Sequence, residues 1–179
     1  METIISGCIQ NDRKAQSALY KQFAPSMLGV CRRYTRTQEE AEDIMIDGFL
    51  QVFAHIGEFR KECPLVAWMK KIMVNAAISH FRINQKFLSQ VELNEMELPA
   101  NVQTNGEDII TKLEAKQVID IMQEMPEEYR MILNLKLIEN YSFKDIEKEL
   151  GGNPNTLRVY FQRGKAWLMN KIQEQEKMM

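Results

Sequence analysis

The sequence predicts an all-α protein. Its 179 residues include only 8 Gly and 5 Pro and no run of alternating β-branched residues, and its apolar residues recur at helical spacings of three and four. Hydrophobic residues make up 45% of the chain, which is enough for the core of one domain or of two small ones. No apolar stretch approaches a membrane span, and charge comes too early for a signal peptide. The three cysteines lie far apart, which favours free thiols in a reducing, cytoplasmic setting.

The first helical segment, or pair of segments, is predicted over residues 13–35. Pro25 is expected to mark a break or a helix start. The apolar residues that we expect to be buried are Leu19, Phe23, Met27, Leu28 and Val30.

A strongly amphipathic helix is predicted from about 38 to 56, beginning with a capping box of Thr37 and Glu40. One side is apolar and should be buried: Ala41, Ile44, Met45, Gly48, Phe49, Val52 and Ile56. The other side mixes carboxylates with apolar residues: Glu39, Asp43, Ile46, Asp47, Leu50 and Ala54. Acidic residues interleaved with apolar ones suit a protein partner. The alternatives are a solvated face with stray apolar residues and a second packing surface inside the domain.

Residues 57–66 are predicted to form a loop with Arg60 and Lys61, followed by a largely buried helix over about 65–84. One stripe of this helix, within roughly 80°, is polar or aromatic. Its members are Trp68, Lys71, Asn75, Ser79 and Arg82. Exposed aromatic residues can stack on unpaired bases while cations hold phosphates, so the stripe is a plausible nucleic-acid surface. The alternative is that Trp68 simply fills the core.

Residues 85–108 are predicted to be an acidic linker, because periodicity is lost and one basic residue stands against five acidic ones. The sequence therefore divides into a module over 1–84, this linker, and a module over 109–179. The second module is expected to open with a helix over about 109–124. Pro126 should start the next helix, in which Met131, Ile132, Leu135 and Ile138 can be buried.

Residues 142–168 predict a helix-turn-helix. Ser142 can cap the first helix together with Asp145, and Gly151-Gly152 should end it, because glycine adopts the left-handed conformation at little cost. Asn153 is a good N-cap, and Pro154 falls at the first position of the second helix.

The second helix of this motif has a sorted surface. Its core side is predicted to hold Leu157, Phe161, Gly164 and Leu168. Its outer side holds amides and guanidinium groups: Asn155, Arg158, Val159, Gln162 and Arg163. Between Asn153 and Lys171 there are four basic residues and no acidic one. In the major groove, Arg can bind guanine, and Asn or Gln can bind adenine. This face therefore predicts that the helix reads the base sequence of duplex DNA. The alternative is a solvated basic helix.

The net charge of −2 is unusual for a protein that holds DNA unaided, because phosphate neutralisation supplies much of such affinity. A DNA reader that works inside a larger machine fits better. The chain has no phosphate loop, nucleophile elbow or metal-ligand spacing, and the pair Asp43 and Asp47 lacks a third ligand. We therefore expect no enzyme, no cofactor, no metal site and no small-molecule substrate.

Three segments together resemble the extracytoplasmic-function (ECF) RNA polymerase sigma factors of the two-domain type. They are AEDIMIDGFLQVF at 41–53, WMKKIMVNAAISHFR at 68–82, and MPEEYRMILNLKLIENYSFKDIEKELGGNPNTLRVYFQRGKAWL at 125–168. They match the family's Ala-Glu-Asp start, its Trp…Asn…Arg skeleton, and its Leu-Pro…Arg…helix-turn-helix pattern. The resemblance covers nearly the whole chain.

The resemblance implies a sigma factor that binds core RNA polymerase and directs initiation at promoters with −35 and −10 elements. The polymerase clamp helices would be bound by Asp43, Ile46, Asp47, Leu50 and Gln51. The −10 element would be melted and read by Arg60, Lys61, Trp68, Lys71, Asn75, Ser79 and Arg82. The −35 element would be read by Asn155, Thr156, Arg158, Val159, Gln162, Arg163 and Lys165. The linker would follow the RNA path of the polymerase, and an anti-sigma factor is a partner that the family alone suggests.

The chain departs from the family pattern at Ile46-Asp47, usually Gln-Glu, at Asn155, usually Gly, and at Val159-Tyr160, commonly a small residue and Arg. Other functions stay open from the residues alone. One is a stand-alone helix-turn-helix regulator whose N-terminal half is a sensor or dimerisation bundle. Another is a recombinase or nuclease centred on Asp43 and Asp47, and a third is an interaction protein that has lost DNA binding.

Overall fold

The computed structural model describes residues 1–84 and 115–178, and the regular structure of these residues is helical. The all-α prediction is therefore confirmed. The chain divides into two compact units, Met1–Phe81 and Arg82–Met179. The predicted acidic linker over 85–108 and the first residues of the helix predicted at 109–124 lie outside the described residues.

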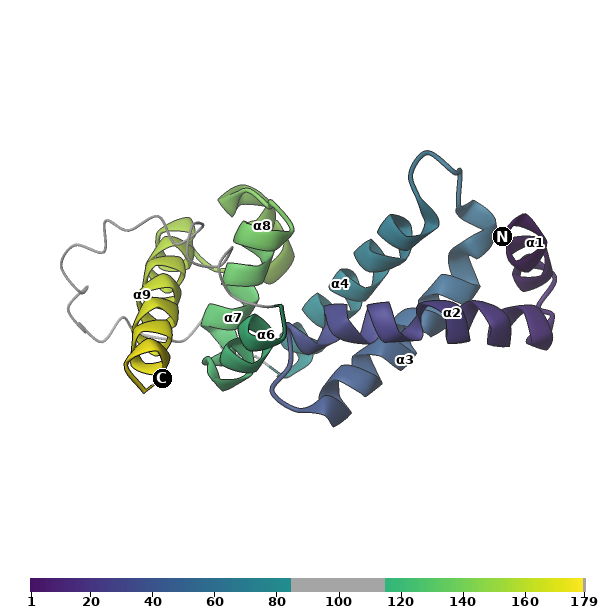
Figure 1. The fold of residues 1–179 in the computed structure, drawn as a ribbon. Helices are drawn as coiled ribbons and strands as arrows, with labels where there is room; N and C mark the ends of the chain where they lie inside the picture. Colours follow the sequence, from purple (N-terminus) through teal and green to yellow (C-terminus); the bar gives the residue numbers. More distant parts are fainter. Residues whose placement is uncertain (85–114, 179) are drawn as a thin grey trace. The chain divides into compact units, whose positions relative to one another are not determined.

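The N-terminal unit contains α1 (Glu2–Ile9), α2 (Arg13–Arg32), α3 (Gln38–His55), the short 3-10 turn η1 (Ile56–Glu58) and α4 (Leu65–Asn84), as Figure 1 shows. Helix α4 continues for three residues beyond the boundary of the unit. The helix α1 was not anticipated from the sequence. It packs against α2 and η1, and its residues Ile5 and Cys8 are buried.

Helix α2 is continuous through Pro25, so the expected break or helix start at this residue is wrong. Proline removes one backbone hydrogen bond from a helix interior, and tertiary packing has to offset that loss. Buried Leu19 precedes Pro25 and buried Met27 and Val30 follow it, and α2 packs against both α1 and α3. Phe23 and Leu28, also expected in the core, are half-buried.

Helix α3 begins as predicted with a complete capping box. The Thr37 hydroxyl accepts a hydrogen bond from the Glu40 amide, and the Glu40 carboxylate accepts one from the Thr37 amide. All the apolar residues predicted to face the core are buried, from Ala41 to Ile56. Gly48 lies so close to Met73 of α4 that a Cβ atom there would collide with the methionine sulfur. The Gly48 side of α3 therefore lies against α4, and the opposite side carries exposed residues.

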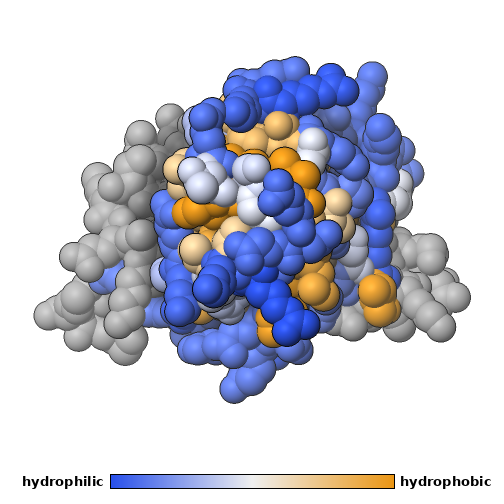
Figure 2. Space-filling model, turned by 90° about the vertical axis from the view of Figure 1, so that its right-hand side faces the viewer, coloured by the Kyte–Doolittle hydropathy of each residue, from blue (hydrophilic) through white to orange (hydrophobic). Residues whose placement is uncertain are grey.

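One end of the N-terminal unit shows apolar atoms in the middle of a hydrophilic rim (Figure 2). This is the side of the molecule on which α1 lies in Figure 1. Ile9 of α1 is 52% exposed, and Met1, its N-cap residue, is 51% exposed. The short helix therefore buries only part of its apolar surface.

The C-terminal unit contains α6 (Ala115–Glu124), α7 (Glu127–Leu133), a π-helical turn η2 (Asn134–Ile138), α8 (Phe143–Leu150) and α9 (Pro154–Met178). Helix α9 packs against α6, α7 and α8. A core cluster of this unit joins α6, α7, α9 and the residue Met125 between α6 and α7: Ile121, Met125, Leu133, Leu168 and Ile172. The buried Arg130 donates from Nη1 to the carbonyls of Met122 and Gln123 at 3.2 and 3.1 Å and so holds the end of α6.

The π-helical turn explains one wrong prediction. Met131, Ile132 and Leu135 are buried as expected, but Ile138 is 38% exposed. The Glu139 amide donates to the Asn134 carbonyl at 3.0 Å, which is a hydrogen bond across five residues. The wider turn displaces the residues after Leu135 from the 3.6-residue period on which the prediction rested.

The helix-turn-helix is confirmed in its details. Ser142 Oγ accepts the Asp145 amide at 3.1 Å, and Asp145 Oδ2 accepts the Ser142 amide at 2.8 Å, so the capping box is complete. Gly151 and Gly152 have φ angles of 75° and 88°, the left-handed region in which glycine is favoured. Asn153 Oδ1 then accepts the Asn155 amide at 2.8 Å, and Pro154 begins α9.

Candidate functional site

The outer face of α3 carries the residues predicted to contact a protein partner. All of them are exposed: Asp43, Ile46, Asp47, Leu50 and Gln51. Ile46 is 50% and Leu50 62% exposed, although both are large and apolar. They lie one helical turn apart and share this face with the two carboxylates. Such a face combines apolar area for burial with charges that can fix the orientation of a partner.

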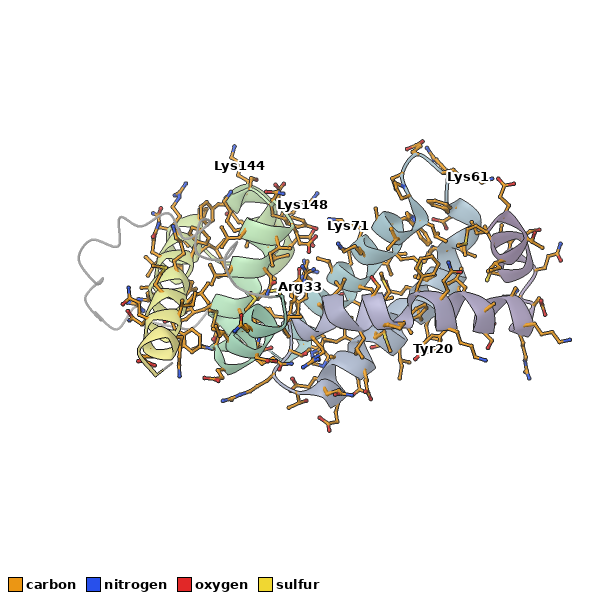
Figure 3. The ribbon with its side chains drawn as sticks, viewed as in Figure 1. Tyr20, Arg33, Lys61, Lys71, Lys144 and Lys148 are labelled. Atoms are coloured by element: carbon orange, nitrogen blue, oxygen red, sulfur yellow. The ribbon has the colours of Figure 1, made fainter. Side chains whose placement is uncertain are left out.

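Tyr20 of α2 extends the apolar side of this face and was missed by the sequence analysis. It is 37% exposed, and its ring lies 4.7 Å from that of Phe49, which in turn lies 6.0 Å from Phe53. Phe49 and Phe53 follow Ile46 by three and seven residues, which are helical spacings, so they lie on the Ile46 side of α3. Tyr20 is labelled in Figure 3. Periodicity within one helix cannot show which residue of another helix packs beside it.

The polar stripe of α4 and the loop before it are accessible. The exposed members are Arg60, Lys61, Lys71, Asn75, Ser79 and Arg82. Trp68 is half-buried and its ring lies 5.4 Å from that of Phe59, tilted by 47°. Trp68 is therefore neither a fully buried core residue nor a free side chain. An aromatic edge flanked by cations and amides is an arrangement that can bind single-stranded nucleic acid.

Lys61 is held by the N-terminal helix. It has a φ of 60°, which is unusual for a residue with a side chain, and its Nζ lies 2.7 Å from Glu2 Oε1 (Figure 3). The hydrogen bond from Lys61, followed by its positive charge, lowers the pKa of Glu2. α1 and the loop before α4 are therefore joined by an ion pair as well as by the packing of α1 on η1.

The outer face of α9 presents the residues predicted to read duplex DNA. Asn155, Arg158 and Gln162 are exposed. The other members are half-buried: Thr156, Val159, Arg163 and Lys165. Arg158 Nη1 donates to Asn155 Oδ1 at 3.0 Å, so two of the predicted readers bind each other.

Tyr160, which stands where the family commonly has Arg, lies in the core rather than on this face. It is 8% exposed, and its ring lies 5.8 Å from that of Tyr129. Burial, followed by the neighbouring Glu128 charge, raises the pKa of its hydroxyl. At this departure from the family pattern the side chain therefore belongs to the core of the C-terminal unit.

Lys144 and Lys148 of α8 are further candidates that the sequence analysis missed. Both are exposed and, four residues apart, lie on one face of the helix (Figure 3). In helix-turn-helix proteins the first helix crosses the DNA backbone, where lysines meet phosphates. The signal was present in the sequence as two lysines at this spacing in the first helix of the motif.

Among the residues that the structure describes, no group of three or more His, Cys, Asp and Glu side chains could hold a metal ion. In the same part of the chain, no helix has the length and apolar character needed to cross a membrane. Asp43 and Asp47 are both exposed, on a face that also carries Leu50.

Comparison with known sequence families gives two matches in chain order. Residues 19–87 match Sigma-70 region 2, and residues 115–168 match Sigma-70 region 4. Together the two matches cover more than half of the chain. They fall on the two halves that carry the α3 and α4 faces and the helix-turn-helix, respectively.

Curated relatives match over nearly their full length. The chain is 23% identical to the ECF RNA polymerase sigma-E factor of Haemophilus influenzae, over 96% of this chain and 95% of that protein. It is 22% identical to the RNA polymerase sigma-H factor of Pseudomonas aeruginosa, over 92% and 89%. Among solved structures, the sigma factor RpoE of Bartonella quintana, in complex with the anti-sigma factor NepR, matches with 15% identity and a TM-score of 0.42, over 88% of this chain and 96% of that one.

Proposed function

Since this chain belongs to the ECF RNA polymerase sigma factors, we propose that its two units divide polymerase binding and promoter reading between them as follows. Sigma factors of this family bind core RNA polymerase and direct it to promoters. RNA synthesis is the work of the polymerase, and this chain contributes no catalytic step. The N-terminal half matches region 2 rather than being a sensor bundle of another kind, so a stand-alone regulator is not favoured.

The outer face of α3 binds core polymerase, through Asp43, Ile46, Asp47, Leu50 and Gln51. The observation that carries this proposal is the exposure of Ile46 and Leu50 together on a face with two carboxylates, because their apolar area is available for burial against a partner. Burial of these side chains supplies affinity, and the carboxylates select the orientation of a basic partner. Tyr20 adds an aromatic contact at the side nearest α2.

The loop before α4 and the polar stripe of α4 read the −10 element as an unpaired strand. Arg60 and Lys71 neutralise phosphates, and Lys61 exchanges its partner Glu2 for a phosphate. Asn75 and Ser79 offer hydrogen bonds to base edges. Trp68 is packed against Phe59, and the exposed part of its ring can stack on an unpaired base. Arg82 extends the basic surface at the last turn of α4.

Helix α9 reads the −35 element in the major groove. Arg158 and Gln162 are exposed and can bind base edges in pairs of hydrogen bonds. Asn155 and Thr156 lie at the start of the helix, and Val159, Arg163 and Lys165 flank the readers. Lys144 and Lys148 of α8 hold the adjacent phosphates.

The acidic segment 85–108 is proposed to join the two units along the RNA path of the polymerase, which stays a prediction from composition and family. An anti-sigma factor is likewise a family expectation for this chain. Because its partners are polymerase and promoter DNA, the protein is proposed to act in the bacterial cytoplasm.

Core binding by a Leu50→Glu variant tests the polymerase contact. We expect the charge at the centre of the face to weaken binding to core polymerase by at least tenfold, because it would be desolvated at an interface without a partner. Gln22→Glu, an exposed site on α2, adds the same charge elsewhere and should bind like the wild type. Equal binding of both variants and the wild type would move the polymerase contact away from α3.

A further inference from the structure

An aromatic pair joins the two helices of the helix-turn-helix. Phe143, the first residue of α8, and Phe161 of α9 are both half-buried, with ring centroids 5.7 Å apart and planes at 80°. This edge-to-face arrangement is favoured by the ring quadrupoles. It leaves part of each ring accessible to side chains at the protein surface.

Basic side chains gather over these two rings. Lys136 Nζ lies 5.2 Å and Arg158 Cζ 5.5 Å from the centroid of Phe143, and Lys165 Nζ lies 5.8 Å from that of Phe161. All are within the range of cation–π attraction. The cations over Phe143 and Phe161 come from the turn before α8 and from α9, so the two rings lie under a basic part of the helix-turn-helix surface.

The two cations over Phe143 are held differently. Lys136 Nζ also donates to the Tyr141 carbonyl at 3.1 Å, which anchors it to the turn before α8. Arg158 is exposed and donates to Asn155 Oδ1 at 3.0 Å. The Arg158 guanidinium is therefore held by an aromatic ring and an amide, while its position on α9 keeps it on the outer face.

We propose that Phe143 is a positioning residue for −35 recognition, holding the Arg158 guanidinium over its ring in the orientation used to read DNA. The inference rests on the proposed role of Arg158 at the −35 element. A guanidinium held before binding loses less conformational freedom when it forms its forked contact. Asn155, whose Oδ1 is taken by Arg158, acts in this arrangement as a support for the arginine rather than as a two-pronged reader of adenine.

Phe143 variants in the full-length protein, assembled with core polymerase, test this inference on a promoter duplex. Phe143→Leu keeps an apolar side chain but removes the ring, and we expect it to weaken holoenzyme binding by about two- to fivefold. Phe143→Tyr keeps the ring and should restore wild-type binding. A merely structural role for Phe143, in its pair with Phe161, would make Phe143→Leu weaken binding by the same factor whether or not Arg158 is present.

A double-mutant cycle shows whether Phe143 acts through Arg158. Once Arg158→Ala is present, Phe143→Leu should weaken binding no further. Gln162 is an uncharged predicted reader on the same helix. In a Gln162→Ala background, Phe143→Leu should weaken promoter binding by the same factor as it does in the wild type. In the free protein, the ring of Phe143 should shift the NMR signals of the Arg158 side-chain protons, and this ring-current shift should disappear in Phe143→Leu. The shift reports the contact without any DNA present.

The outcomes separate the inference from its premise. If Arg158→Ala weakens binding but Phe143→Leu is additive with it, or if the ring-current shift is absent in the wild type, the positioning role is refuted while −35 reading by Arg158 stands. If Arg158→Ala leaves promoter binding unchanged, the proposed role of Arg158 fails and the inference falls with it.

Discussion

The Ser142 cap of α8 offers a quantitative test of how the helix-turn-helix is held. Ser142 Oγ accepts the Asp145 amide at 3.1 Å and contacts Asp145 Oδ2 at 2.6 Å. Ser142→Ala removes both interactions, and loss of such a cap costs about 1 kcal/mol. Because α8 has only 8 residues, we expect the lost cap to lower the free energy of local opening of α8 by this amount.

Hydrogen–deuterium exchange of the α8 amides measures this cost directly. About 1 kcal/mol corresponds to roughly fivefold faster exchange across α8. Ser142→Thr keeps the hydroxyl and should exchange like the wild type, and the amides of α3 in the other unit should not change. Unchanged exchange of α8 in Ser142→Ala would refute the argument that the capping box holds this helix.

Further variants test the charges and thiols of the two units. Replacing Lys144 and Lys148 by alanine should lower the salt slope of promoter binding by about 1.8, or about 0.9 for each phosphate that is no longer neutralised, without changing sequence preference. The pKa of the Glu2 carboxyl, which Lys61 lowers, should lie below that of an ordinary glutamate by NMR titration and return toward the ordinary value in Lys61→Ala. The stabilisation from this pair should be present at neutral pH and lost as the pH falls through the lowered pKa. At pH 8, iodoacetamide should label the exposed Cys63 and spare the two buried cysteines, because burial raises their pKa values.

Local signals in the sequence predicted the features that depend on a few neighbouring residues. The caps at Thr37, Ser142 and Asn153 and the glycine stop at Gly151 were predictable because the groups involved lie within three or four residues of each other. The buried and exposed faces of α3 followed from its period for the same reason.

Features set by contacts between helices were not predictable. Pro25 stays inside α2 because packing on both sides outweighs the missing hydrogen bond, and Ile138 reaches the surface because a π-helical turn changes the period. Tyr20 joins the α3 face only through its contact with Phe49. Phe143 and Arg158 are both visible in the sequence, but only the fold brings the ring beneath the cation.

The most direct test of the account is to measure binding of the purified protein to core RNA polymerase and, separately, to promoter duplex alone. The net charge of −2 and the exposed α3 face predict tight binding to polymerase, weak binding to duplex alone, and promoter-specific transcription only when both are combined. Tight, sequence-specific binding to duplex without any contact to polymerase would contradict the account and would return the α3 face to being a solvated surface.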